Sequence, residues 1–490
     1  MIYRSTRSAN LEVSGASAII QGLAPDGGLF VPKVFPEAFS KNELKKLLEL
    51  SYQDLAGKIL GRFLPDYTPE QLANIVKGAY GTQWDDAKIA PVTENKAGSY
   101  FLELFHGPTL AFKDIALQCL PRLMKTALFN QADNRDIVIL TATSGDTGTA
   151  AMRGFQGLGK TRVIVFYPYQ GVAPIQLKQM LSESKDNTVA IAIEGNFDQA
   201  QTKVKQIFND QDMRKLLADH DFTFSSANSM NVGRLLPQVV YYFYAYGQLV
   251  ARGDIAMGDP VNYSVPTGNF GDILAGYYAK KLGLPVGKLI CASNKNNVLT
   301  DFFKTGHYDK NRDFYVTNSP SMDILVSSNL ERLLFDISGD PDFVKGLMDQ
   351  LKETGEYQLP DDLREKLSDF AADYATPEEI EGEIKRVYDE SGYVIDPHTA
   401  VASLAAHRFT GNDAKTVVLS TASPYKFPET VYHAVSGQAV TEKGIPALKQ
   451  LAELTGDLPA SIKEFLGASA QEIVIPPSEM EAEVKRQLSL

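Results

Sequence analysis

Lys113 is the residue whose position best suits covalent chemistry. It lies in the segment FHGPTLAFKDIALQCL (105–120), where Thr109 can cap a following helix. An apolar stripe runs through this helix at spacings of three and four: Leu110, Lys113, Leu117 and Leu120. Lys113 is therefore predicted on the apolar face within about the first turn, where burial and the helix dipole both disfavour an ammonium. The resulting neutral amine is the form that makes an imine with an aldehyde.

An isolated lysine with this spacing also has an ordinary interpretation. Its charged end more often reaches water or pairs with a neighbouring acid, here Asp114. Two small-residue loops elsewhere favour the chemical interpretation, because each follows a predicted strand and opens a predicted helix.

The loop PTGNFGDILAG (266–276) has the character of an anion site. Gly268 and Gly271 allow backbone N–H groups to converge on one point, and the helix N-terminus favours a dianion there. The loop lacks the Gly-Lys-Ser/Thr ending of nucleoside-triphosphate loops and is not GxGxxG, so a phosphate held without Mg²⁺ fits it better. A tight turn between strand and helix is the alternative.

The loop TATSGDTGTAA (141–151) offers donors that suit a carboxylate. These donors are the hydroxyls of Ser144 and Thr147 and the backbone around Gly145. The alternative is an ordinary helix start with Asp146 as its cap.

The composition argues against several other classes of function. The formal net charge is −12 without any basic block, which argues against nucleic acid or an anionic membrane as a partner. Cys119 and Cys291 form no Cys-x-x-Cys pair and the histidines are scattered, so we expect no disulfide framework and no metal site. The first residues lack an apolar core of signal-peptide length, so a cytoplasmic location is expected.

The elements that position these residues alternate along the chain. At 490 residues the chain is too long for one core and suggests two or three domains. Apolar β-branched runs, most of them separated by helical segments, begin beyond residue 99: 136–142, 161–168, 188–193, 262–266, 287–292 and 415–421. This alternation is typical of a doubly wound, mainly parallel α/β sheet. The aromatic stretch 239–250 is too short to span a membrane and is predicted to be a buried helix.

Two regions differ from this alternation. Residues 1–98 are predicted to be a small helical unit. Residues 319–390 are charged, have a helical pattern and are divided by four prolines, so we predict a helical insertion before the last strand.

Together these segments resemble the threonine synthases, which are fold-type II pyridoxal-phosphate (PLP) enzymes. The shared motifs are a lysine in FHGPTLAFKD, an SGDTG loop and a GNFGD loop, in that order. The resemblance begins at SAIIQGLAPDGGLFVP, includes SSANSMNVGRLLPQ (225–238) and ends at LSTASPYKFPE (419–429), so it extends over most of the chain. The N-terminal stretch and the ending resemble the longer, fungal and bacterial branch of the family.

The resemblance implies roles for the residues of each motif. Lys113 would be the catalytic lysine that also carries PLP, and Thr421 would place its hydroxyl at the pyridine nitrogen. The cofactor phosphate would be held by one loop: Gly268, Asn269, Phe270, Gly271 and Asp272. The substrate carboxylate would meet four residues: Ser144, Gly145, Asp146 and Thr147. The substrate phosphate would meet three: Asn228, Ser229 and Arg234.

Two of these assignments have alternatives. Many fold-type II relatives have asparagine where this chain has Asp146, so the substrate carboxylate is assigned to the hydroxyls and backbone amides rather than to this side chain. Asn228 and Ser229 could instead cap the long helix that begins near Asn231, with Arg234 on its solvated face.

The resemblance also implies a domain organisation and a reaction. Residues 1–98 would form a helical N-terminal domain, 99–130 and 258–490 the large PLP-binding domain with the insertion at about 319–390, and 131–257 a small α/β domain. The reaction would convert O-phosphohomoserine and water to L-threonine and phosphate by γ-elimination and β-addition. Neither a metal nor an obligate protein partner is expected.

Three other functions remain open on the sequence. A serine/threonine dehydratase or cysteine synthase of the same fold would act on a substrate without phosphate, so a second anion site would separate it from a threonine synthase. A non-catalytic relative would bind its ligand as a sensor. A nicotinamide dehydrogenase would need GxGxxG after the first strand and an acidic residue some twenty positions on, and this pair is not found.

Overall fold

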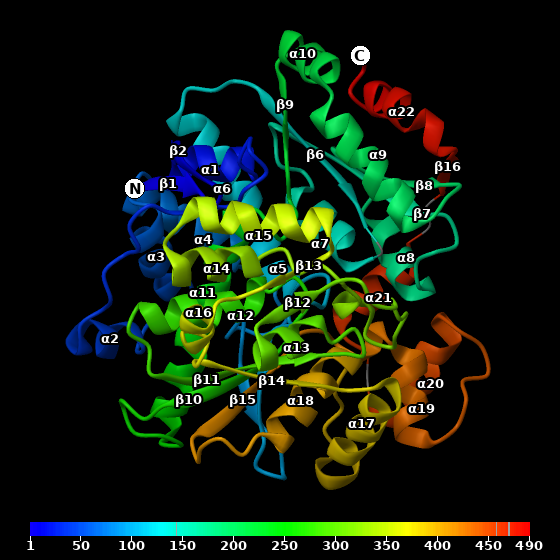
Figure 1. Cartoon of the computed structure of the whole chain (residues 1–490). Helices are drawn as coiled ribbons and strands as arrows, with labels where there is room; N and C mark the ends of the chain where they lie inside the picture. Colours follow the sequence, from blue (N-terminus) through cyan, green and yellow to red (C-terminus); the bar gives the residue numbers. More distant parts are fainter. Residues whose placement is uncertain (144, 457, 469–470) are drawn as a thin grey trace.

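Two sheets, each built from segments far apart in the sequence, carry the architecture (Figure 1). The computed structural model describes residues 1–143, 145–456, 458–468 and 471–490. The larger sheet has the order β14 (Phe370–Tyr374), β11 (Val286–Ser293), β10 (Val261–Pro266), β15 (Lys415–Ser420), β5 (Tyr100–Glu103) and β4 (Val92–Glu94). Its pairings are parallel except for that of β4 with β5.

The smaller sheet is parallel throughout. Its order is β16 (Ile473–Ile475), β8 (Thr188–Ile193), β7 (Thr161–Pro168), β6 (Asp136–Ala142) and β9 (Phe222–Ser225). The predicted strands are confirmed in both sheets, and β6, β7 and β8 agree with the prediction residue for residue. These strands are continuous β-branched runs because a parallel sheet is buried on both faces.

Helices cover both faces of each sheet, which explains why alternate strand residues enter different cores. In β6, Ile137 and Ile139 pack in the main core, whereas Val138 and Leu140 pack with residues of the helices on the opposite face. The helices of the smaller sheet are α7 (Asp146–Phe155), α8 (Pro174–Ser182), α9 (Phe197–Asn209), α10 (Gln211–Asp219) and α22 (Met480–Gln487). The expected doubly wound α/β class is confirmed.

The larger sheet is packed in the same way. The helices against or beside it are α12 (Gly271–Lys281), α13 (Val298–Thr305), α17 (Pro377–Ser391), α18 (Pro397–Arg408), α19 (Pro428–Ser436) and α20 (Ile445–Thr455). Short or central helices complete the core: α5 (Lys113–Leu117), α6 (Leu120–Asn130), α11 (Val232–Arg252) and α21 (Ala460–Leu466). The aromatic stretch 239–250 lies within α11, as predicted, and most of its side chains are buried. In the described part of the chain, no helix has the length and apolarity that a bilayer crossing needs.

The N-terminal region contains strands as well as helices. An antiparallel sheet has the order β2 (Ser8–Ser14), β1 (Ile2–Ser5) and β3 (Phe30–Pro32). The helices are α1 (Gly15–Gln21), α2 (Lys41–Leu47), α3 (Tyr52–Phe63) and α4 (Pro69–Ala79). The predicted helical unit therefore contains strands that the sequence did not indicate. β1 and β3 have only four and three residues, and β2 has no fully buried residue, so the sequence gives little strand signal here. Tertiary contacts stabilise these strands, such as the hydrogen bond of 2.9 Å from the Tyr3 hydroxyl to the Phe63 carbonyl.

The region 319–390 is mostly helical, as predicted, but it also supplies a strand to the larger sheet. Its elements are α14 (Leu330–Ser338), α15 (Pro341–Glu353), β13 (Glu356–Gln358), α16 (Asp361–Glu365), β14 and α17, and β13 pairs with β12 (His307–Asp309). The strand β14 was not predicted because it is a partly exposed edge strand without a continuous apolar run.

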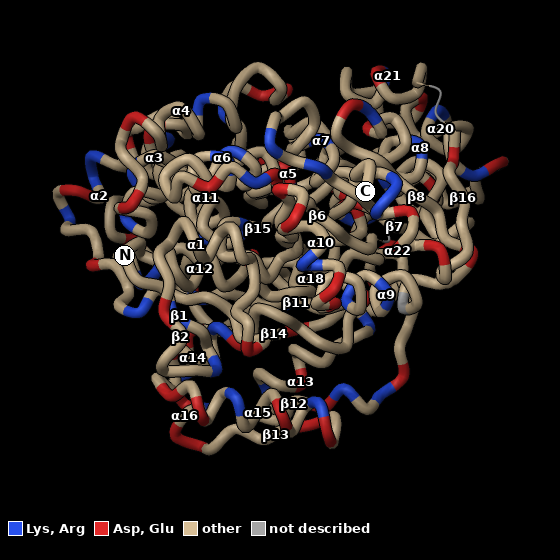
Figure 2. The backbone as a smooth tube through the Cα atoms, turned by 90° about the horizontal axis from the view of Figure 1, so that it is seen from above, with Lys and Arg blue, Asp and Glu red and all other residues tan. Residues whose placement is uncertain are grey.

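Near the C-terminus, one strand does not belong to the domain to which the prediction assigned its residues. The predicted division assigns 258–490 to the larger part, yet β16 pairs with β8 and extends the smaller sheet. A three-residue strand gives little signal in the sequence, and its pairing covers an otherwise open edge of β8. Figure 2 shows Lys and Arg interspersed with Asp and Glu over the elements in view, in keeping with the absence of a basic block in the sequence.

Candidate active site

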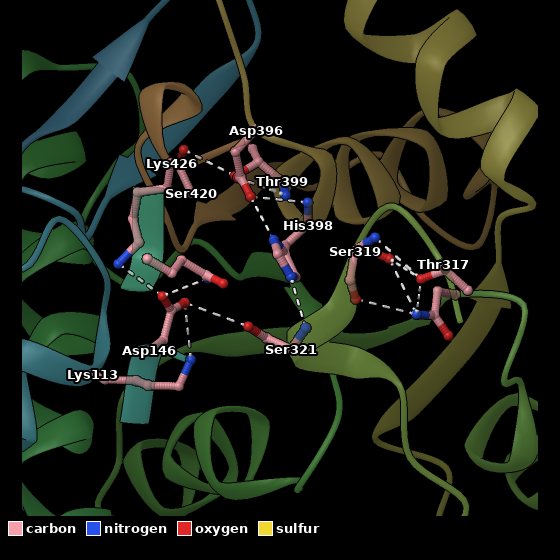
Figure 3. Close-up of polar contacts among 12 residues, drawn as sticks. Lys113, Asp146, Thr317, Ser319, Ser321, Asp396, His398, Thr399, Ser420 and Lys426 are labelled. Carbon is pink, nitrogen blue, oxygen red and sulfur yellow. Dashed lines mark hydrogen bonds and ion pairs between the residues drawn. The ribbon is translucent and has the colours of Figure 1, made fainter. Parts of the chain in front are cut away.

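Lys113 opens α5 and points toward Asp146, and its side chain is 12% exposed. Its Nζ lies 3.6 Å from Oδ2 of Asp146, the first residue of α7 (Figure 3). The neighbouring acid, Asp114, is hydrogen-bonded to Thr109 instead. The backbone N–H and the hydroxyl of Thr109 each donate to the Asp114 carboxylate at 2.7 Å. Thr109 therefore does not cap the helix as predicted, and Lys113 has a partner from the start of α7 instead of Asp114.

The surroundings of Lys113 favour its neutral amine. Burial lowers the pKa of Lys113, and the nearby charges of Lys426 and Arg234 lower it further, against the opposite effect of Asp146. Burial alone would raise the pKa of Asp146, but Lys426 and Lys113 outweigh it and hold that pKa well below its usual range. The site thus contains one carboxylate that stays ionised and a lysine that gives up its proton more readily than usual.

Lys426 is a site residue to which the sequence analysis gave no role. It ends the short 3-10 helix Pro424–Lys426, and its side chain is 2% exposed. Its Nζ contacts Oδ1 of Asp146 at 2.8 Å. The signal was present, because Lys426 lies in the segment LSTASPYKFPE that carries the resemblance, but nothing in the sequence indicated its partner.

The glycine-rich loop between β10 and α12 has its carbonyl groups occupied and its amides free. Asn329 donates to the carbonyl of Asn269 from its backbone at 3.0 Å and from its side chain at 2.9 Å, and Ser327 donates to that of Gly268 at 2.7 Å. Among the described residues, the amides of 268–271 find no acceptor. Phe270 has a φ of +64°, which turns the chain sharply into α12.

This loop fits the phosphate of PLP. Free amides at the start of a helix of 11 residues form the kind of cradle that binds a phosphate dianion. A Cβ on Gly268 would lie 3.1 Å from the carbonyl oxygen of Ser321, so glycine is needed there for close packing. Lys113 for the aldehyde and this loop for the phosphate make a donor set that suits the expected cofactor.

Asp272 has surroundings that do not suit direct contact with a phosphate. Its carboxylate accepts hydrogen bonds from the hydroxyls of Tyr241 and Tyr242 of α11, and burial raises its pKa to about 7. These bonds hold the start of α12 against α11. Asp272 therefore supports the loop through its helix.

Thr421 directly follows β15 and lies beside the lysine segment. Its carbonyl accepts a hydrogen bond of 2.8 Å from the backbone N–H of Phe112, and Ala111 pairs with Ala422. The structure thus brings Thr421 close to Lys113, although the two are separated by about 300 residues in sequence.

The loop before α7 is shaped by Thr143. Its hydroxyl accepts hydrogen bonds from the amides of Gly145 and Gly148 at 3.0 and 3.1 Å. Asp146 is the first helical residue and caps nothing, because its side chain accepts from Gln176 at 2.9 Å and pairs with the lysines. Ser144, predicted at the substrate carboxylate, lies outside the described residues. Thr147 follows Asp146 within α7.

Arg234 lies inside the protein and not on a solvated face. It is 5% exposed, and burial lowers its pKa to about 10. Its Nη1 donates to the carbonyl of Ala227 at 3.1 Å, whereas its Nε has no hydrogen-bond partner among the described residues. Asn231 does cap α11, by accepting from the amide of Gly233 at 2.9 Å. The alternative interpretation is therefore wrong on both points, because Asn231 caps α11 in place of Asn228 and Ser229, and Arg234 is buried.

Asn228 and Ser229 have other neighbours as well. The side-chain oxygen of Asn228 accepts from the hydroxyl of Thr141 at 3.1 Å, and the hydroxyl of Ser229 lies 3.4 Å from that of Ser328. Asn228 is thereby bonded to β6, which leads into the loop before α7. Ser229 contacts the segment 327–329, which donates hydrogen bonds to the glycine-rich loop.

A chain of contacts from α18 reaches the same carboxylate. His398 donates through Nδ1 to Asp396 at 2.7 Å, so its Nε2 is the acceptor for the backbone N–H of Ser321 at 3.1 Å (Figure 3). The hydroxyl of Ser321 lies 3.5 Å from Oδ2 of Asp146. Sequence reasoning missed these residues because their relation depends on the fold of 319–329. No group of acidic, His or Cys side chains in the described ranges could hold a metal ion.

Comparisons with known proteins agree on one family. Three family models match the chain: "Threonine synthase N terminus" over 2–80, "Pyridoxal-phosphate dependent enzyme" over 91–422 and "Threonine synthase, C-terminal" over 399–468. The threonine synthase of Saccharomyces cerevisiae is 38% identical over 468 residues, which cover 89% of each chain. The PLP-bound threonine synthase structure from Brucella melitensis has a TM-score of 0.89 and 36% identity, and it covers 99% of each chain.

A second group of relatives is longer. The human protein named threonine synthase-like 1 is 43% identical over 439 residues, which are 87% of this chain. The chain spans only 58% of that relative's length.

Proposed function

Because the chain belongs to the threonine synthase family of PLP-dependent enzymes, we propose that it converts O-phosphohomoserine and water to L-threonine and phosphate. This reaction would make it a carbon–oxygen lyase acting on phosphates, at the last step of threonine biosynthesis. The observation that carries the choice of substrate is Arg234, a buried guanidinium whose Nε lacks a partner among the described residues. It is suited to a second phosphate, which dehydratases and cysteine synthases of this fold do not bind.

The residues that would hold PLP are Lys113, the amides of 268–271 and the hydroxyl of Thr421. When bound, PLP supplies an electron sink that stabilises negative charge developing on substrate carbons. The Thr421 hydroxyl would be the partner of the pyridine nitrogen, and a neutral partner would leave that nitrogen less protonated than a carboxylate would.

Lys113 acts as the proton carrier. Its neutral amine, when free, would be placed to take protons from Cα and Cβ of the substrate and to return them. The lowered pKa of Lys113 suits this role because a useful base must be unprotonated near neutral pH. Phosphate leaves from Cγ and water adds at Cβ.

The other residues orient the substrate. The amides around Gly145 and the hydroxyl of Thr147 receive the carboxylate, and Arg234 with Asn228 and Ser229 receives the phosphate. Two fixed anions hold the carbons between them against Lys113. Asp146 contributes through its charge, since its carboxylate is already engaged by two lysines.

Two measurements test this proposal. The purified protein should be yellow, and borohydride should remove the visible band and leave the cofactor attached to a peptide that contains Lys113. The protein should then release phosphate and form threonine in equal amounts from O-phosphohomoserine. Turnover of serine or threonine without phosphate dependence would favour a dehydratase, and binding without turnover would favour a sensor. The cytoplasmic location stays a prediction.

A further inference from the structure

Lys426 is a second buried lysine at the carboxylate that Lys113 contacts. The two lysines contact different oxygens of the Asp146 carboxylate (Figure 3). Nζ of Lys426 lies 2.8 Å from Oδ1, and Nζ of Lys113 lies 3.6 Å from Oδ2. All three side chains are at most 12% exposed, so water screens these charges poorly.

The two lysines differ in how well their ammonium groups are satisfied. An ammonium has three donors, and Nζ of Lys426 has three acceptors: Asp146 Oδ1 at 2.8 Å, the Thr109 carbonyl at 2.8 Å and Gln179 Oε1 at 3.3 Å. Lys113 contacts Asp146 at 3.6 Å, beyond the usual range of a hydrogen bond. A buried charge is tolerated where its hydrogen bonds are satisfied, so Lys426 is the better place for a proton.

The charges around this group add to a positive excess. Two lysines contact the one carboxylate of Asp146, and the charge of a third buried cation, Arg234 of α11, acts on Lys113. A positive charge in this buried group must therefore be neutralised. Loss of the Lys113 proton costs the least free energy, because the Lys113 ammonium has the fewest hydrogen-bond acceptors.

The remaining charged or titratable groups nearby are engaged elsewhere. Asp114 of α5 accepts two hydrogen bonds from Thr109. His398 of α18 donates to Asp396 through Nδ1 and accepts from the backbone N–H of Ser321 through Nε2. Asp323 accepts from Asn294 at 2.7 Å and from the hydroxyl of Thr317 at 2.7 Å.

We propose that Lys426 is a positioning residue that keeps Lys113 neutral: it holds the Asp146 carboxylate as its own counter-ion and so deprives Lys113 of one. This role deepens the proposed function, on which it rests, because a neutral Lys113 is what both cofactor attachment and proton transfer require. Lys426 itself need not contact cofactor or substrate.

The test measures the protonation of Lys113 directly in the full-length protein freed of cofactor. Trace acetic anhydride acetylates only unprotonated amines, with loss of acetate, so the rate at the Lys113 peptide as a function of pH reports its pKa by mass spectrometry. In Lys426→Met, the freed carboxylate becomes the partner of Lys113, and we expect its pKa to rise by about one unit or more. Near neutral pH the acetylation rate should fall about tenfold.

Matched variants identify the cause. Lys426→Arg keeps the positive charge and should keep most of the wild-type profile, and Lys125→Met, an exposed site on α6, should not change it. Asp146→Asn should lower the pKa of Lys113, and adding Lys426→Met to Asp146→Asn should raise that pKa less than Lys426→Met does alone, because no carboxylate remains for Lys426 to withhold. An unchanged Lys113 profile in Lys426→Met would overturn the proposal.

The design separates this inference from the proposed function. If Lys426→Met does not fold, Lys426→Gln takes its place, since it removes the charge but can still donate hydrogen bonds to Asp146 and to the Thr109 carbonyl; an unchanged Lys113 pKa in that variant would overturn the proposal. In the folded variants, the ascending limb of kcat against pH should move with the Lys113 pKa, because kcat reports the enzyme–substrate complex, in which the Lys113 amine is free. If wild-type protein does not attach PLP at Lys113 or does not turn over O-phosphohomoserine, the proposed function fails, whereas the acetylation result still stands.

Discussion

Arg234 and Ala227 are joined by a hydrogen bond of 3.1 Å from Nη1 to the backbone carbonyl, deep inside the protein at the start of α11. Nε of the same guanidinium lacks a partner among the described residues, although burial of a polar group without a hydrogen bond is costly. Arg234 also acts on Lys113, whose pKa its charge lowers. A buried guanidinium with an unused donor is suited to bind an anionic ligand.

Arg234→Ala should therefore damage catalysis and not folding. Loss of a charged contact to the substrate phosphate should cost on the order of 2–4 kcal/mol in the transition state, and thus at least about thirtyfold in kcat/KM. Visible absorbance of the bound cofactor should be unchanged. Inorganic phosphate should raise the melting temperature of the wild type more than that of the variant, and the exposed Arg214→Ala serves as control. Loss of PLP with substrate affinity retained would mean that Arg234 belongs to the cofactor.

Lys113→Ala should abolish turnover, because the residue is assigned both the attachment of cofactor and the transfer of protons. We expect a loss of at least about a thousandfold in threonine formation, and no cofactor fixed to the chain by borohydride. Lys125→Ala, an exposed lysine of α6, should behave as wild type. Near-normal threonine formation by Lys113→Ala would reject the assignment.

Gly271→Val should weaken PLP binding far more than it lowers the melting temperature of the cofactor-free protein. A Cβ at Gly271 would meet its nearest described atoms at 3.4 and 3.5 Å, so the fold tolerates it, whereas the side chain would crowd the phosphate at the amides. Loss of one such contact predicts an increase in Kd of about tenfold, measurable by absorbance titration. Gly346→Val has open space around it and controls for a valine in a helix. Equal PLP affinity in mutant and wild type would contradict the loop assignment.

His106 should contribute stability that disappears at alkaline pH. Its ring contacts Asp85 at 2.6 Å and Glu103 at 2.7 Å, and although burial opposes it, these carboxylates raise the pKa of His106 to about 9. Because the folded pKa exceeds the ordinary value of 6.5, the contribution is complete below about pH 6.5 and is lost as pH rises through about 9. It amounts to about 3 kcal/mol at most.

The measurement for His106 is the melting temperature between pH 6 and 10. His106→Gln should be less stable than wild type at pH 6, and the difference should shrink steadily toward pH 10. His407→Gln, at an exposed position, should show no such convergence. A difference between His106→Gln and wild type that does not depend on pH would show that the contact acts by packing alone.

Local pattern alone was enough for much of this protein. The strands β6, β7 and β8 were predicted to the residue because a buried parallel strand must be a β-branched run. The family resemblance was carried by three short loops, each with its chemistry in adjacent residues, and the comparisons confirm it. β14 and β16 were missed because edge strands of three to five residues have no period of their own.

The site shows where such local reasoning ends. The helical period puts Lys113 on an apolar face, but it does not show that Asp114 is bound by Thr109 or that Asp146 takes its place. Nor does it show that Lys426, more than 270 residues beyond Asp146, meets the same carboxylate. Periodicity predicts which face of an element is buried. Which charges meet there depends on the packing of distant elements, and only that packing determines the protonation of Lys113.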